Sequence, residues 1–150
     1  MREILFRGKS MNDGEWVHGS LVITTIEPAD EPPVKHYHIE DMTIGVFPNE
    51  HQSGITETVA PNTVGQYTGL TDKNGKKIFE GDIVRDDYES GVYARVAWLP
   101  QGCGWYLVYS QGDRRMGHRA RGCGYQQDVL LEVIGNIHDN PELIGVTDNA

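Results

Sequence analysis

One stretch of the chain concentrates basic side chains that could bind an anion. This stretch is polar, and its basic residues are Arg114, Arg115, His118, Arg119 and Arg121. Guanidinium groups donate several hydrogen bonds in a fixed fork that matches phosphate and carboxylate oxygens. This loop could order around a nucleotide, another anion or an acidic protein surface, and the alternative is a solvated loop. A ligand site would gather the arginines around one pocket with a carboxylate, whereas an interaction module would spread them over its surface.

His36 and His38 are the candidate metal ligands. Alternate residues of a strand share a face, so the two imidazoles could hold one divalent cation. Asp41 or His51 would have to supply a third ligand. The alternative is an exposed edge strand with polar side chains. Because two ligands without a defined third are a weak metal signal, we predict no metal and no other cofactor.

Two other pairs could do chemistry in principle. Glu80 and Asp82 flank Gly81 and could act as general acid and base. We favour a turn there, with a positive φ at Gly81 and hydrogen bonds from backbone amides to Asp82. Cys103 and Cys123 are expected to be free thiols, because their spacing with His118 matches no common zinc motif. We therefore predict no catalytic residue and favour a protein that is not an enzyme.

Charge and hydropathy disfavour some classes of binding partner and some cellular compartments. The net charge of −9 opposes binding to phosphate backbones and to anionic membranes. The chain has no apolar run of about 18 residues, so no transmembrane helix is expected. Its first seven residues are too charged for a secretory signal. We expect a cytoplasmic protein that binds neither nucleic acid nor membranes.

Short alternating segments joined by glycine and proline turns predict a mainly β fold. In the N-terminal half, residues 3–7 and 15–23 should form a hairpin around a turn at 12–14. The proline-containing residues 27–34 should be a loop. Further strands are expected at 35–39 and 64–70, and residues 41–48 could form another.

The C-terminal half predicts a small, twisted, SH3-like β-barrel, because closing a sheet removes its exposed edges. Its strands are expected at residues 81–84, 93–98, 105–109 and 130–137. Asn74-Gly75 predicts a hairpin turn of type I′, in which both residues have positive φ. Short helical turns are expected at 77–79 and, behind Asn140, at 141–143. We treat residues 1–150 as one domain, with 1–64 and 65–145 as possible sub-lobes.

Three blocks of sequence carry a family resemblance: residues 1–7, 66–84 and 132–143. Their distinctive turn and cap residues are Gly69, Asn74, Gly75, Glu80, Gly81, Asp82, Gly135, Asn136 and Pro141. In this combination and order the blocks resemble the YopX family, small proteins found largely in phages and prophages. The resemblance implies a β-rich fold, a viral or prophage context and self-association. It supplies no catalytic residue.

Two functions from different classes remain open. The first is a phage or prophage accessory protein without enzymatic activity, which associates with itself and with an unknown phage or host protein. The alternative is an enzyme or small-ligand binder that uses residues 114–121, for instance on a nucleotide. Direct nucleic-acid binding would need a basic surface concentrated enough to overcome the net charge of −9.

Overall fold

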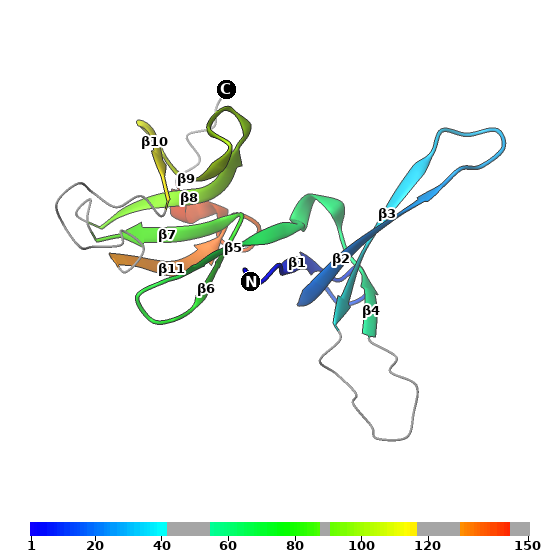
Figure 1. Ribbon diagram of the computed structural model, residues 1–150, viewed down its shortest axis with the longest axis horizontal. Coiled ribbons are helices and arrows are strands. Elements are labelled where there is room, and N and C mark those ends of the chain that lie inside the picture. The colour runs from blue at the N-terminus through cyan, green and yellow to red at the C-terminus, as the bar shows by residue number, and fades with distance from the viewer. Residues whose placement is uncertain (42–54, 88–90, 117–129, 145–150) are drawn as a thin grey trace, which may run out of the picture. The chain divides into compact units, whose positions relative to one another are not determined.

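The computed structural model describes residues 1–41, 55–87, 91–116 and 130–144, and these residues are mainly β-strand (Figure 1). The predicted fold class is confirmed. Contacts between Cα atoms divide the chain into two compact units, which we call unit 1 (Met1–Gln66) and unit 2 (Tyr67–Ala150). Over the described ranges, no helix has the length and hydropathy needed to cross a membrane.

Unit 1 is built on an antiparallel sheet in the order β4-β3-β2-β1-β5. Its strands are β1 (Phe6–Lys9), β2 (Trp16–Ile26), β3 (Val34–Asp41), β4 (Ile55–Thr58) and the first residues of β5 (Gly65–Thr71), with the 3-10 turn η1 (Pro61–Thr63) before β5. The predicted N-terminal hairpin is confirmed, because β1 pairs with β2 in antiparallel register. The strand considered for residues 41–48 lies almost wholly outside the described residues.

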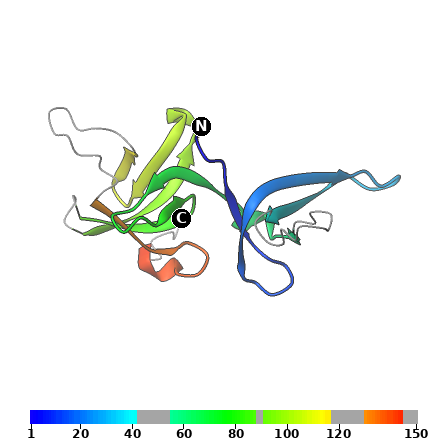
Figure 2. The same ribbon diagram turned by 60° about the horizontal axis from the view of Figure 1, so that its bottom comes forward.

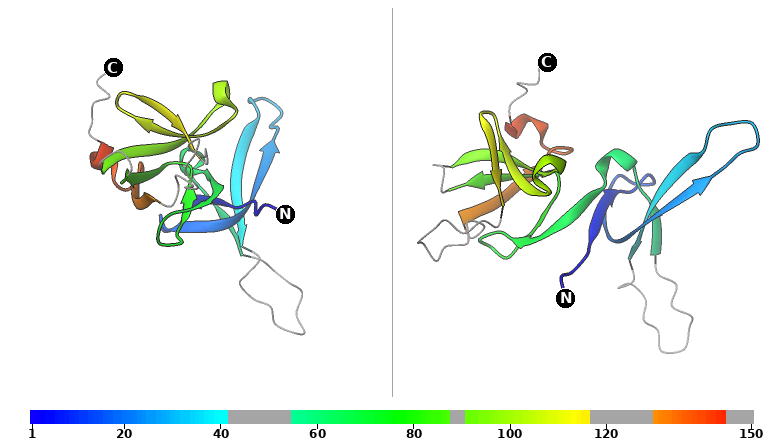
Figure 3. Two further views of the ribbon diagram at one scale, coloured as in Figure 1. Left: turned by 60° about the vertical axis from the view of Figure 1, so that its left-hand side comes forward. Right: turned by 45° about the horizontal axis from the view of Figure 1, so that its top comes forward.

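The β2–β3 hairpin is longer than the strands beside it. β1 pairs with β2 only from Trp16 to Gly19, and β4 pairs with β3 only from His38 to Asp41. The register continues to the pair Ile26↔Val34, so the far end of the hairpin is two strands wide. Figures 2 and 3 show this end projecting from the sheet of unit 1. We call residues 23–26 and 34–36 the distal ribbon.

Unit 2 contains a five-stranded antiparallel sheet in the order β10-β9-β8-β7-β11. Its strands are β7 (Asp82–Asp86), β8 (Val92–Leu99), β9 (Gly104–Tyr109), β10 (Gly112–Arg115) and β11 (Leu131–Asn136), with η2 (Pro100–Gly102) between β8 and β9. The predicted β8–β9 hairpin is confirmed. All four strands expected in a barrel lie in this sheet.

One face of this sheet forms the core of unit 2. Alternate residues of each strand point to it, and the buried cluster is Ile78, Val84, Ala94, Val96, Leu107, Met116 and Leu131. A closed barrel would need hydrogen bonds between the outermost strands, β10 and β11. The described residues show no such pairing, so the SH3-like barrel is not confirmed.

Two local predictions were wrong. Residues 77–79 form the strand β6 (Lys77–Phe79), not a helical turn, because Phe79 and Lys77 pair with Tyr67 and Thr71 of β5. A short apolar run fits either structure, and here the neighbouring strand decides. The hairpin turn is also not type I′, since Gly75 has a φ of 81° but Asn74 has no positive φ. The helical turn at the C-terminal end is confirmed as η4 (Pro141–Ile144).

Candidate functional site

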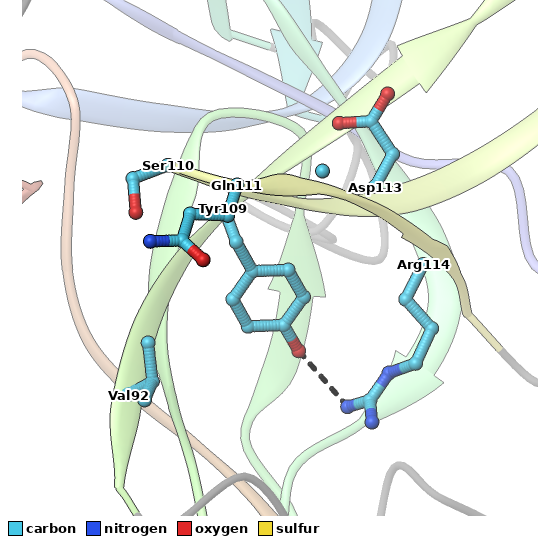
Figure 4. Close-up of a pocket in the computed structure, with 7 residues that line it drawn as sticks. Val92, Tyr109, Ser110, Gln111, Asp113 and Arg114 are labelled. Carbon is cyan, nitrogen blue, oxygen red and sulfur yellow. Dashed lines mark hydrogen bonds between the residues drawn. The ribbon is translucent and has the colours of Figure 1, made fainter.

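The described residues of unit 2 contain a buried polar cluster of Asp86, Tyr109 and Arg114. Asp86 ends β7, Tyr109 ends β9, and Arg114 is the third residue of β10. Asp86 lies 23 residues before Tyr109, and Tyr109 lies five residues before Arg114. The sheet brings them to one end of its core face, where Tyr109 and Arg114 line an open pocket (Figure 4).

The three side chains share hydrogen bonds. The Tyr109 hydroxyl donates to Asp86 Oδ2 at 2.5 Å and accepts from Arg114 Nη2 at 2.9 Å. Arg114 Nη2 also donates to Asp86 Oδ2, which makes the charged pair a salt bridge. The Arg114 Cζ atom lies 5.7 Å from the centre of the Tyr109 ring, within the range of a cation–π contact. Tyrosine thus bridges the two charges and fixes the orientation of the guanidinium.

The two charges differ in exposure. The Asp86 side chain is 0% exposed, whereas that of Arg114 is 22% exposed. Burial lowers the pKa of the Arg114 guanidinium, which stays charged because its ordinary pKa is so far above neutrality. A carboxylate removed from water is tolerated only when it is paired and hydrogen-bonded. Arg114 is therefore needed to keep Asp86 in the core.

Strand alternation explains how the cluster forms. Asp86 follows Val84 at the spacing of two residues that keeps both on the core face. Arg114 pairs with the buried Leu107 and so points to the same face. Because β8 and β9 lie between β10 and β7, the sheet must curl over this face for Arg114 to reach Asp86. The sequence analysis missed Asp86. The signal that could have found it is its position two residues after Val84, which places a carboxylate on the same strand face as an apolar residue.

Of the other four basic residues of this stretch, the structure describes only Arg115, which does not join the cluster. Arg115 follows Arg114 on β10, so its side chain projects from the opposite face, and it is exposed. His118, Arg119 and Arg121 lie outside the described residues, as does Cys123. Cys103 is exposed. Of the five residues predicted to bind an anion or partner, the structure places one beside a pocket.

His36 and His38 lie on one face of β3, with their ring centres 6.4 Å apart. Both ring nitrogens of His38 lie beside hydroxyl groups: Nε2 is 3.3 Å from Thr24 Oγ1, and Nδ1 is 3.2 Å from Thr58 Oγ1. Asp41 falls on the other face of the strand by alternation. His51 lies outside the described residues, and among those described no three His, Cys, Asp or Glu side chains could hold a metal.

Comparisons with known proteins place these observations in a family. The family model described as YopX protein matches residues 5–145 of the chain. The chain belongs to the YopX family. The crystal structure of protein EF1440 from Enterococcus faecalis has a similar fold, with a TM-score of 0.51 and 22% identity over 96% of this chain and 99% of that one.

One enzyme also shows local similarity to this YopX-family chain. It is an apicoplast lipoyl synthase of Toxoplasma gondii, 24% identical over 98 residues. The match covers 60% of this chain and only 18% of that enzyme. This local similarity is therefore too short to assign the enzyme's activity to this protein.

Two of the three blocks that resemble the YopX family meet in unit 2, where Asp72 joins the second block to the third. Its carboxylate accepts hydrogen bonds from the backbone amides of Asn74 and Lys76 in the same turn. It also accepts one from Val133 of β11, at 3.0 Å. Burial alone would raise the pKa of Asp72, but the amides of Val133, Lys76 and Asn74 outweigh this and lower it. The polar turn thus anchors the edge strand of the sheet.

The other distinctive family residues also hold turns together. Gly81 has a φ of 85°, and its carbonyl accepts a hydrogen bond from the Ile137 amide. Asp82 is 1% exposed and accepts from the Phe79 amide at 2.8 Å. A Cβ atom on Gly135 would lie 2.4 Å from Asn140 Oδ1, in the loop before Pro141. These contacts give the glycines and acids of the family blocks a role in the scaffold.

Proposed function

We propose that this YopX-family protein is a phage or prophage accessory protein that acts by protein association, and that its distal ribbon binds a second copy of the chain. One observation carries this proposal: the distal ribbon exposes apolar side chains on both faces. Ile26 and Val34 lie opposite each other on one face and are 55% and 44% exposed. Ile23, on the other face, is 49% exposed. Grouped apolar side chains of this kind are typical of interaction surfaces.

The backbone supports the same conclusion. A hairpin of only two strands is marginally stable in water. Its outer edges present amide and carbonyl groups that can pair with another strand. Within the described part of unit 1, no strand pairs with the outer edges of residues 24–26 and 34–36. A partner that covers the apolar pair and adds a strand would stabilise the distal ribbon.

A second copy of the chain meets both requirements. A two-fold axis places the same apolar pair and the same free edge of each ribbon against one another. The charges are also complementary. The distal ribbon carries Lys35 and no carboxylate, while the loop that closes it carries Glu27, Asp30 and Glu31. Antiparallel ribbons would bring the acidic loop of one copy toward Lys35 of the other.

Val34→Thr tests this proposal by sedimentation equilibrium. Threonine keeps the branched shape that favours strands but removes apolar surface, so the ribbon should form while its association weakens. The matched control is Val92→Thr, which makes the same change at a 47% exposed strand residue of unit 2. We expect wild type and V92T to exceed the monomer mass of 16.8 kDa at concentrations where V34T approaches it. A monomeric wild type, or equal effects of both variants, would contradict the proposal.

A further inference from the structure

The cluster of Asp86, Tyr109 and Arg114 adjoins an open pocket of about 520 Å³ in unit 2. This volume lies within the roughly 300–1,000 Å³ typical of small-molecule sites. Its lining comes from the start of β8, the end of β9 and the first part of β10: Val92, Tyr109, Ser110, Gln111, Gly112, Asp113 and Arg114. All the lining residues that the structure describes belong to unit 2.

Arg114 presents a positive charge to this pocket. Asp86 is 0% exposed and cannot be reached by solvent, whereas the Arg114 side chain is 22% exposed and lines the pocket. Asp113 precedes Arg114 on the strand, and Figure 4 shows its carboxylate directed away from the guanidinium. A ligand that enters beside Arg114 therefore meets a cation whose counter-ion is hidden behind it.

We propose that this pocket binds a small molecule through an oxyanion, a phosphate or a carboxylate, held by Arg114. Asp86 and Tyr109 already fix the guanidinium, so little side-chain entropy is lost when a ligand binds. Planar guanidinium donors match the oxygens of phosphate and carboxylate groups. Val92 and the Tyr109 ring offer apolar contact to the ligand body, and Ser110 and Gln111 offer hydrogen bonds.

The sequence pointed to the whole basic stretch of residues 114–121. Of its basic residues the structure describes Arg114 and Arg115, and only Arg114 lines the pocket. Tyr109 from β9 lines the pocket beside it, and the buried Asp86 from β7 is its counter-ion. Asp86 and Tyr109 act as positioning residues, because their hydrogen bonds set the direction of the guanidinium. Asp86 offsets the charge of Arg114, so the ligand is expected to bind with moderate affinity.

Calorimetric titration with inorganic phosphate, AMP and citrate tests the proposal and separates the two oxyanion sources. Phosphate and AMP probe phosphoryl oxygens, and citrate probes carboxylates. We expect at least one probe to bind, and Arg114→Lys to weaken that probe about tenfold, since lysine keeps the charge but loses the fork. The matched control is Arg115→Lys, the same change one residue along on the opposite face, which should leave affinity within about twofold.

A second variant keeps the proposal testable if R114K fails to fold. Val92→Trp places a large side chain at the pocket wall and leaves Asp86, Tyr109 and Arg114 themselves unchanged. Val92 pairs with Asp86 across the strands but is 47% exposed, so the sheet should accept the larger side chain. We expect V92W to keep the melting temperature of wild type and to lose binding. The proposal is overturned if none of the three probes binds, if R114K and R115K weaken binding equally, or if V92W binds like wild type.

Discussion

Replacing Arg114 should destabilise the protein more than replacing Asp86, although both changes break the same salt bridge. Arg114→Met leaves a carboxylate that is 0% exposed without its cation, which should cost about 3–5 kcal/mol of unfolding free energy. Asp86→Asn leaves an amide that can still accept from Tyr109, and a guanidinium whose side chain is 22% exposed to water. That variant should cost only about 1–2 kcal/mol.

The double variant D86N/R114M sharpens this prediction. It removes both charges together, so no isolated charge remains in the core, and it should be more stable than R114M alone. Urea unfolding measures all three variants. A Trp16→Phe background would make Trp98 and Trp105 of unit 2 the only tryptophan reporters, since the chain has three tryptophans.

Arg85→Met is the matched control for this cycle. Arg85 pairs with Glu132 at 2.7 Å and with Asp87 at 3.1 Å, but its side chain is 40% exposed. The same substitution there should cost at most about 1 kcal/mol, as is usual for surface salt bridges. Equal costs for D86N and R114M, or a cost for R114M no larger than that of R85M, would refute the reasoning about exposure.

Three further results are expected. Asp72 has a lowered pKa when folded, so its contribution to stability is complete above the ordinary value of 3.8 and is lost as pH falls through the folded value. As pH is lowered, the free energy of unfolding should thus fall more steeply for wild type than for Asp72→Asn. Parallel curves for the two proteins would contradict this role of Asp72. Gly81→Ala should lower the free energy of unfolding in urea by about 1–2 kcal/mol, because Gly81 has a φ of 85°. An unchanged free energy would contradict a positive φ at this residue. Zinc should not raise the melting temperature through His36 and His38, and a rise in wild type that His38→Gln abolishes would show a site there.

Local patterns in the sequence were enough to predict most strands. Alternating residues located β2, β8 and β9, and Asn74-Gly75 located a hairpin. Two details depended on neighbours that the sequence does not show. Residues 77–79 form a strand because β5 lies beside them. In the turn before them the Asp72 carboxylate accepts from the amides of Asn74 and Lys76, and only Gly75 has a positive φ.

The candidate site was predictable only in part. Arg114 was singled out because it belongs to a basic stretch, but Asp86 comes from β7, 28 residues earlier, and one sequence does not reveal so distant a pairing. Asp86 lies beyond the strand predicted at residues 81–84, and only the sheet register places it beside Leu131 in the core. β2 also continues to Ile26, beyond the predicted end at residue 23, because Thr24 and Thr25 interrupt the apolar alternation there.

Hydrogen–deuterium exchange over a dilution series tests most directly whether the distal ribbon mediates self-association. We expect the backbone amides of residues 24–26 and 34–36 to be protected at high protein concentration and to lose that protection on dilution. The five-stranded sheet of unit 2 provides the internal reference, and its exchange should not change with concentration. Equal exchange of the distal ribbon at every concentration would contradict the account.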